Sequence, residues 1–156
     1  GIHSGDSSAV LPTYSLSPAV VGKMVEYARK LAFALNIKGL INIQFAIKKE
    51  DVYVIEANPR ASRTTPFIAK AYEVPYLNMA TQVMLGVKKI SDFTIDKKLT
   101  GFAIKVPVFS YNKFPGVDKN LGPEMKSTGE MIYYIKDIYD PFFRDLDSKR
   151  SMFLSR

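Results

Sequence analysis

Apolar and polar positions alternate in two neighbouring stretches of the first half of the chain. The first stretch covers residues 41–48 and the second covers residues 52–58. A period of two predicts β-strands, because successive side chains of a strand point to opposite faces of the sheet. Lys49, Glu50 and Asp51 separate the two stretches and predict a turn, so the strands should pair as an antiparallel hairpin.

The same alternation predicts how the two strands of this hairpin pair. We expect Lys48 opposite Val52, and this register pairs further residues as follows: Phe45 with Ile55, Ile43 with Ala57, Gln44 with Glu56 and Asn42 with Asn58. A slip of one residue would move the polar side chains to the apolar face, so the pattern favours this register.

Helical spacing dominates the region before the hairpin and the region after it. Apolar residues three and four apart predict a helix that Ser17 caps, that starts at Pro18 and that stops near Asn36. Further elements follow: helices over 66–72 and 76–85, strands over 101–109 and 131–135, and a last helix from 140 onward. Residues 1–15 and 111–129 are predicted loops. This mixed order of elements indicates an α+β fold.

The amino-acid composition excludes several kinds of functional site. The chain has 156 residues, 47% hydrophobic and 24% charged, which is typical of one globular domain. The absence of cysteine excludes disulfides, cysteine-ligated metal sites and thiol nucleophiles, and a single histidine, His3, excludes multi-histidine metal motifs. No apolar run approaches the ~20 residues of a membrane span, and no signal peptide opens the sequence.

The net charge of +7 favours an anionic ligand. The lysines occur as scattered pairs, at 48–49, 88–89 and 97–98, and no combination of basic and aromatic residues resembles an RNA-binding sheet. Nucleic-acid binding is therefore disfavoured. The loop over 111–129 is long enough to contact a substrate.

Gln44, Glu56 and Asn58 should share one face of the hairpin, with Arg60 and Arg63 just beyond its end. Carboxylate and amide oxygens suit a hard divalent cation such as Mg²⁺, and guanidinium groups bind phosphate oxygens. Together they predict a metal and phosphate site of the kind that phosphoryl transfer needs. A plain solvated sheet face would show a similar pattern, and periodicity alone leaves that interpretation open.

Other sequence motifs of phosphate chemistry are missing, since neither G-x-x-x-x-G-K-[ST] nor G-x-G-x-x-G occurs.

His3, Asp6 and Ser7 fall within five residues of one another. A Ser–His–Asp hydrolase is a weak interpretation of them, because so short a segment does not easily place the base between the other two groups. They also read as ordinary turn residues.

Three spaced segments resemble one enzyme family. The run N-I-Q-F … V-Y-V-I-E-A-N-P-R-A-S-R-T, at 42–64, resembles the metal-binding end of an ATP-grasp ligase. G-I-H-S-G-D-S at 1–7 and N-K-F-P-G-V-D-K-N-L-G-P-E-M-K-S-T-G-E at 112–130 resemble the large chain of carbamoyl-phosphate synthetases, and the N-K-F-P-G form resembles its second ATP-grasp half. Biotin carboxylases carry similar E-A-N-P-R runs.

The resemblance implies roles for the residues of the hairpin. Gln44, Glu56 and Asn58 match the family's ligands for two Mg²⁺ or Mn²⁺ ions on ATP, with Glu56 as the bridge between the ions. Arg60 and Arg63 match its phosphate-binding arginines and count as catalytic residues.

The resemblance also implies roles for the N-terminal segment. His3 matches a catalytic histidine near the carbamate or acyl phosphate. Ile2, through its carbonyl oxygen, and Ser7 match a K⁺ site beside the nucleotide. Ser4 and Asn42 match residues that line the nucleotide site.

The family resemblance further implies a fold, a reaction and partners. Residues 1–135 would form the C-terminal lobe of an ATP-grasp fold, and residues 136–156 a helical tail or the start of a linker. The reaction would convert ATP and carbamate into ADP and carbamoyl phosphate for pyrimidine or arginine synthesis, with ammonia from a glutamine amidotransferase. We expect the N-terminal lobe to precede Gly1, a cytoplasmic or organellar location, and no turnover by this chain alone.

Two alternatives remain at this stage. One is another ATP-grasp ligase of the biotin-carboxylase type, and the other is a non-catalytic module that binds an anionic partner.

Overall fold

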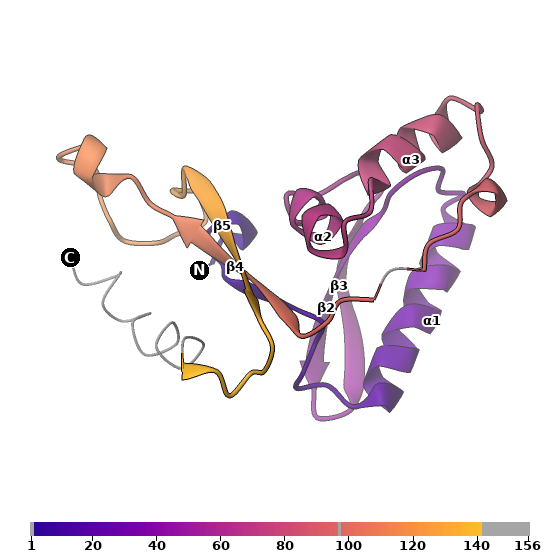
Figure 1. Cartoon of the computed structure of the whole chain (residues 1–156), viewed down its shortest axis with the longest axis horizontal. Helices are drawn as coiled ribbons and strands as arrows, with labels where there is room; N and C mark the ends of the chain where they lie inside the picture. The colour runs from indigo at the N-terminus through magenta and orange to yellow at the C-terminus, as the bar shows by residue number, and fades with distance from the viewer. Residues whose placement is uncertain (1, 97, 142–156) are drawn as a thin grey trace. The chain divides into compact units, whose positions relative to one another are not determined.

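The computed structural model describes residues 2–96 and 98–141. They belong to two compact units, which we call the central unit, within 13–97, and the terminal unit, formed by the two ends of the chain, within 1–12 and 98–156 (Figure 1). The central unit contains the following elements: α1 (Pro18–Ala34), β2 (Asn42–Lys48), β3 (Asp51–Asn58), α2 (Thr64–Tyr72), α3 (Tyr76–Met84) and a 3-10 turn (Ile90–Asp92). The terminal unit contains these: a 3-10 turn (Ser4–Asp6), β1 (Ala9–Leu11), β4 (Phe102–Val108), a second 3-10 turn (Tyr111–Lys113) and β5 (Gly129–Ile135).

The predicted first helix is confirmed as α1. Oγ of Ser17 accepts the backbone N–H of Val20 at 3.3 Å, which satisfies one of the free amides at the helix start. Asn36 lies just past the end with a positive φ of 49°, a conformation that stops the helix. The helix packs against β3 (Figure 1). It therefore supports one side of the hairpin.

The register of the hairpin is as predicted at one end and differs at the other. Asn42 pairs with Asn58 and Gln44 with Glu56, but Phe45 pairs with Val54 instead of Ile55. The register shifts between Gln44 and Phe45, so β3 carries one extra residue in a β-bulge.

The prediction was wrong at the turn because the turn is tighter than we expected. Lys48 pairs with Asp51, not with Val52, and a two-residue turn remains. Lys49 is the first residue of this turn and has a φ of 59°, a positive value of the kind that tight hairpin turns require. The bulge compensates for this shift and leaves the polar pairs at the far end in register.

The two helices after the hairpin form close to where the spacing predicts them. The first, α2, begins at Thr64, two residues earlier than expected, because Oγ of Ser62 accepts its N–H at 3.2 Å and proline is tolerated in a first helical turn. Phe67 and Ala71 are buried on α2. α2 and α3 pack together, and this pair extends the core of the central unit.

The terminal unit contains a three-stranded antiparallel sheet in the order β1-β4-β5. The prediction that residues 1–15 form only a loop was wrong, since Val10 pairs with Ile104 in β4. A strand of three residues is too short to show a period, and its partner lies far away in the sequence. The expected strands over 101–109 and 131–135 are confirmed as β4 and β5. The helix expected from 140 onward lies, apart from Asp140 and Pro141, outside the described residues.

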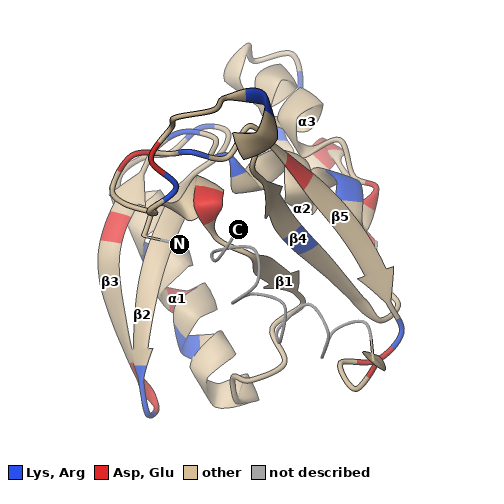
Figure 2. Ribbon diagram, turned by 90° about the vertical axis from the view of Figure 1, so that its left-hand side faces the viewer, with Lys and Arg blue, Asp and Glu red and all other residues tan. Residues whose placement is uncertain are grey.

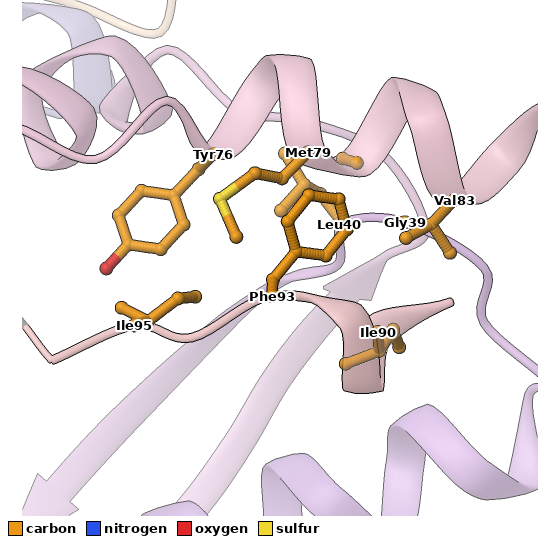
Figure 3. Close-up of a pocket in the computed structure, with 9 residues that line it drawn as sticks. Gly39, Leu40, Tyr76, Met79, Val83, Ile90, Phe93 and Ile95 are labelled. Carbon is orange, nitrogen blue, oxygen red and sulfur yellow. The ribbon is translucent and has the colours of Figure 1, made fainter. Parts of the chain in front are cut away.

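An apolar pocket of about 150 Å³ lies within the central unit (Figure 3). Tyr76, Met79 and Val83 of α3 line one side, and Leu40, Phe93 and Ile95 complete it. No lining side chain carries a charge, so the pocket does not match a phosphate site. Among the described residues, no helix has the length and apolarity to cross a membrane.

Candidate functional site

A cluster of one carboxylate and two amides lies on the hairpin of the central unit. Nε2 of Gln44 and Nδ2 of Asn58 donate hydrogen bonds to the same atom, Oε1 of Glu56, at 2.7 and 2.9 Å. Gln44 reaches Glu56 from the directly opposite position on β2, and Asn58 from two residues further along β3. Pairing between strands therefore gathers the three side chains that the sequence predicted for one face.

The donor set of this cluster fits a hard divalent cation. Within residues 2–96 and 98–141, the amide oxygens of Gln44 and Asn58 accept no hydrogen bond, so they remain available as ligands beside the Glu56 carboxylate. Oxygen donors of this kind suit Mg²⁺ or Mn²⁺. The described part of the chain contains no group of three or more His, Cys, Asp or Glu side chains at metal-binding distance. With a single carboxylate, the cluster needs the negative charge of a bound ligand to complete a coordination shell.

Two arginines follow the cluster directly. Arg60 lies in the short loop after β3, where its backbone N–H bonds to the Asn58 carbonyl at 2.8 Å and its exposed Nη1 to the Ala61 carbonyl at 3.1 Å. Arg63 directly precedes α2, so its charge adds to the positive N-terminal end of that helix. The loop thus presents cationic groups next to the Glu56 carboxylate in the sequence, an arrangement that suits the phosphates of a nucleotide–metal complex.

The N-terminal segment folds into a compact turn in the terminal unit. The carbonyl of His3 accepts the Asp6 N–H at 3.0 Å and the Ser7 hydroxyl at 3.1 Å. The carbonyl of Ser4 lies 3.4 Å from Nζ of Lys105. Ile2, at the start of the segment, is exposed. His3, Ser4 and Ser7 therefore come together.

The described residues fit a K⁺ site only in part. Ser7 Oγ and the His3 carbonyl bring two oxygens together, while a lysine ammonium already occupies the neighbourhood of the Ser4 carbonyl.

Asp6 anchors this turn to the strand region at the other end of the chain. Asp6 is 3% exposed, and its carboxylate accepts backbone N–H groups from Lys126 at 3.0 Å and Ser127 at 2.8 Å. Burial by itself raises the pKa of Asp6, but the hydrogen bonds from Ser127 and Lys126 and the nearby His3 outweigh it and hold the pKa below the ordinary aspartate value. Asp6 is therefore charged and already hydrogen-bonded in the folded protein.

The geometry does not match a Ser–His–Asp triad. Such a triad needs the Nδ1–H of the histidine to donate to the aspartate. Nδ1 of His3 instead accepts the backbone N–H of Gly5 at 3.0 Å, so it carries no hydrogen to donate. The hydrolase interpretation has no support in the structure.

The predicted site residues fall into the two units. Gln44, Asn58 and Glu56 form the cluster of the central unit, and Asn42 lies opposite Asn58 at the start of β2. The N-terminal residues belong to the terminal unit.

Sequence reasoning overlooked the buried Lys105. Its side chain is 3% exposed, and its Nζ lies 3.9 Å from Oε2 of Glu130. A lysine inside the apolar run of β4 was the available signal, because a strand otherwise places lysine in water.

Charge is otherwise dispersed over the described residues. Figure 2 shows Lys and Arg on many elements, interspersed with Asp and Glu along the ribbon. This distribution does not single out one basic surface for an anionic partner.

Known proteins identify the family. The sequence pattern of the family described as carbamoyl-phosphate synthase L chain, ATP binding domain, matches residues 1–90. The chain belongs to this family. It is 51% identical over 140 residues to the carbamoyl phosphate synthase large chain of Acidobacterium capsulatum, a match that covers 85% of this chain and 13% of the relative.

A second relative has a more specific description. The chain is 45% identical over 155 residues to the "carbamoyl phosphate synthase large chain, C-terminal section" of Methanocaldococcus jannaschii, with 92% of this chain and 25% of the relative covered. The chain thus spans a small part of the length of its relatives.

The fold also has relatives among solved structures. The urea carboxylase of Kluyveromyces lactis superposes with a TM-score of 0.67 at 16% identity, covering 90% of this chain and 15% of that one. This likeness confirms the predicted α+β ATP-grasp fold.

Proposed function

We propose that this chain is the C-terminal lobe of the ATP-grasp unit that phosphorylates carbamate in a carbamoyl-phosphate synthetase large chain. The carboxylate–amide cluster around Glu56, with two arginines beside it, is the observation that carries the proposal. Family membership supports the enzyme class. The similarity to a relative described as a C-terminal section supports the second half of the large chain.

The reaction is a phosphoryl transfer. A carbamate oxygen forms a bond to the γ-phosphorus of ATP, and the bond between that phosphorus and the β–γ bridging oxygen breaks, so ADP leaves with the electron pair. Carbamate attacks as an anion, and no proton has to move in this step. The protein therefore has to position the reactants and stabilise negative charge.

Glu56, Gln44 and Asn58 would hold the cations that accompany the nucleotide, Mg²⁺ or Mn²⁺, with Glu56 between two of them. When bound, these ions neutralise the charge on the β- and γ-phosphates. The pairing of Gln44 with Glu56 keeps the ligands preorganised, because the two backbones are fixed by strand hydrogen bonds.

Arg60 and Arg63 would contact the transferring phosphoryl group. A guanidinium binds two phosphate oxygens at once and stays charged at every working pH. The exposed Arg60 side chain is free to turn toward a ligand from its contact with the Ala61 carbonyl.

The N-terminal turn would face the carbamate. His3 supplies an imidazole there, Ser4 and Asn42 line the nucleotide site, and a K⁺ ion would take oxygens from Ile2 and Ser7. The His3 carbonyl and Ser7 hydroxyl, 3.1 Å apart, support the K⁺ proposal, and the other ligands would come from outside this chain.

The remaining parts of the enzyme lie outside this chain in the proposal. They are an N-terminal ATP-grasp lobe for adenine binding, the rest of the large chain, and a glutamine amidotransferase that supplies ammonia for pyrimidine or arginine synthesis in the cytoplasm or an organelle. We expect that this chain alone does not catalyse the reaction.

The decisive experiment uses the full-length protein that carries this chain. Synthesis of ATP from carbamoyl phosphate and MgADP reports the carbamate-phosphorylating site in reverse. We expect Glu56→Ala to reduce this rate more than about 100-fold, because the carboxylate ligand is lost. Glu50→Ala, in the turn at the opposite end of the same hairpin, is the matched control and should keep its activity. Near-normal activity of Glu56→Ala would refute the proposal.

Two further observations separate the alternatives. A biotin-dependent carboxylase would carry one E-x-N-P-R unit in its parent chain, whereas two tandem units would favour the large chain. A non-catalytic anion-binding module would show no synthesis of ATP from carbamoyl phosphate, and its RNA affinity would fall steeply with salt while Mg·ATP produced no heat of binding.

A further inference from the structure

The chain contains a single histidine, and its ring is held by its own backbone. The N–H of Gly5 donates to Nδ1 of His3 at 3.0 Å. A backbone amide can only donate, so Nδ1 must offer a lone pair. A neutral imidazole has one N–H, and the hydrogen therefore lies on Nε2.

The Nε2 atom remains open to a ligand. It has no hydrogen-bond partner among residues 2–96 and 98–141. The described residues also contain no buried side-chain nitrogen or oxygen without a partner. An unpartnered Nε2 that is not buried must therefore contact solvent.

The turn that carries the ring is fixed from two directions. Its Asp6 is buried and bonds to the backbone of Lys126 and Ser127, and the Ser127 hydroxyl returns a bond to the Gly5 carbonyl at 3.1 Å. The buried Lys105 lies against the Ser4 carbonyl. These contacts hold the Gly5 amide in place, and with it the orientation of the His3 ring.

We propose that His3 acts as a fixed hydrogen-bond donor through Nε2–H and does not act as a general base. A base needs a lone pair on the nitrogen that faces the substrate, and in this tautomer the lone pair is on Nδ1 and already engaged. An N–H donor suits a developing anionic oxygen, such as that of a carbamate or an acyl phosphate. The identity of that ligand rests on the proposed function, whereas the tautomer rests on the Gly5 contact alone.

Nitrogen NMR of the 156-residue chain tests the tautomer directly. With one histidine, the two ring nitrogens give an unambiguous pair of ¹⁵N signals, which are recorded at alkaline pH. We expect the N–H type of signal for Nε2 and the lone-pair type for Nδ1. Protonation of Nδ1, or an even mixture of the two tautomers, would overturn the proposal. This result does not depend on whether the proposed enzyme activity exists.

Two substitutions in the full-length protein test the donor role. The amide nitrogen of His3→Gln reaches the position of Nε2, while that of His3→Asn reaches only the position of Nδ1. We expect His3→Gln to retain ATP synthesis from carbamoyl phosphate within about tenfold and His3→Asn to lose about 100-fold, the usual effect of removing one oxyanion donor.

Equal losses in both variants, a more active His3→Asn, or no loss in either would contradict the donor role. An unchanged far-UV spectrum and melting temperature in both variants separates this outcome from misfolding. A failure of the proposed function itself would show differently, as full activity of Glu56→Ala.

Discussion

Gln44 and Glu56 lie directly opposite each other on β2 and β3, and Nε2 of Gln44 donates a 2.7 Å hydrogen bond to Oε1 of Glu56. The strand register shifts at the very next pair, between Gln44 and Phe45. The bulge thus separates a tight turn at one end of the hairpin from an undisturbed polar cluster at the other. Bulges occur frequently beside functional sites, where they direct side chains.

Removing one of the proposed amide ligands should weaken the binding of the cation without abolishing catalysis. We expect Gln44→Leu to raise the Mg²⁺ concentration for half-maximal activity of the full-length protein roughly tenfold, with most of kcat restored at saturating Mg²⁺. Gln82→Leu is the matched control, since the side-chain amide of Gln82 donates to Asn78 of the same helix. An unchanged Mg²⁺ dependence of Gln44→Leu would argue against a metal at this cluster.

Replacing an arginine by lysine keeps the charge and removes the two-pronged geometry. We expect Arg60→Lys to lower kcat/KM for MgADP and carbamoyl phosphate about tenfold, and Arg60→Met to lower it further. Arg29→Lys, on the exposed side of α1, should leave it unchanged. Steady-state kinetics at fixed ionic strength makes the comparison. Equal activity of Arg60→Met and the unmodified protein would mean that Arg60 does not bind the ligand.

Asp6 should contribute to stability in a pH-dependent manner. Its pKa is lowered by folding, so its contribution is complete above the pKa of the unfolded chain, about 3.9, and is lost as the pH falls toward the folded value. We expect Asp6→Asn to lower the free energy of unfolding at neutral pH by about 1–3 kcal/mol, because it disturbs bonds to buried amides. Urea unfolding at neutral and acid pH measures both effects.

The control for this prediction is Asp51→Asn, at the exposed start of β3, which should change stability little. The difference in the free energy of unfolding between Asp6→Asn and the unmodified chain should shrink below pH ~4, where the stabilisation from the ionised Asp6 carboxylate begins to be lost. A difference that stays constant down to strong acid would mean that the carboxylate charge is not what stabilises the turn.

Glycine should improve the hairpin turn. Lys49 adopts φ of 59°, a left-handed conformation that costs a residue with a Cβ roughly 1 kcal/mol. We expect Lys49→Gly to stabilise the central unit by about 0.5 kcal/mol after the entropy cost of glycine, seen as a higher melting temperature. Lys48→Gly, one residue earlier in β2, should instead destabilise it. A lower melting temperature of Lys49→Gly would mean that another contact holds the turn.

The secondary structure of the central unit could be predicted because its signals are local. Ser17 and Pro18 mark the start of α1, and the alternation over 41–48 and 52–58 marks the strands. The pairing of Gln44 with Glu56 followed from the need to keep polar groups off the apolar face. The bulge could not be predicted, because a two-residue turn and a longer one fit the same alternation, and the geometry of the Lys49 turn selects between them.

The sequence by itself determined the composition of the candidate site: one carboxylate, two amides and two arginines, ordered around the end of a hairpin and similar to one enzyme family. Only the tertiary structure decided the state of the N-terminal turn. Asp6 is held by amides about 120 residues away, and Lys105 reaches the Ser4 carbonyl across a separation of 101 residues. Contacts of that range leave no period in the sequence, because they are selected by the need of buried charged groups for hydrogen-bond partners, which here come from distant backbone.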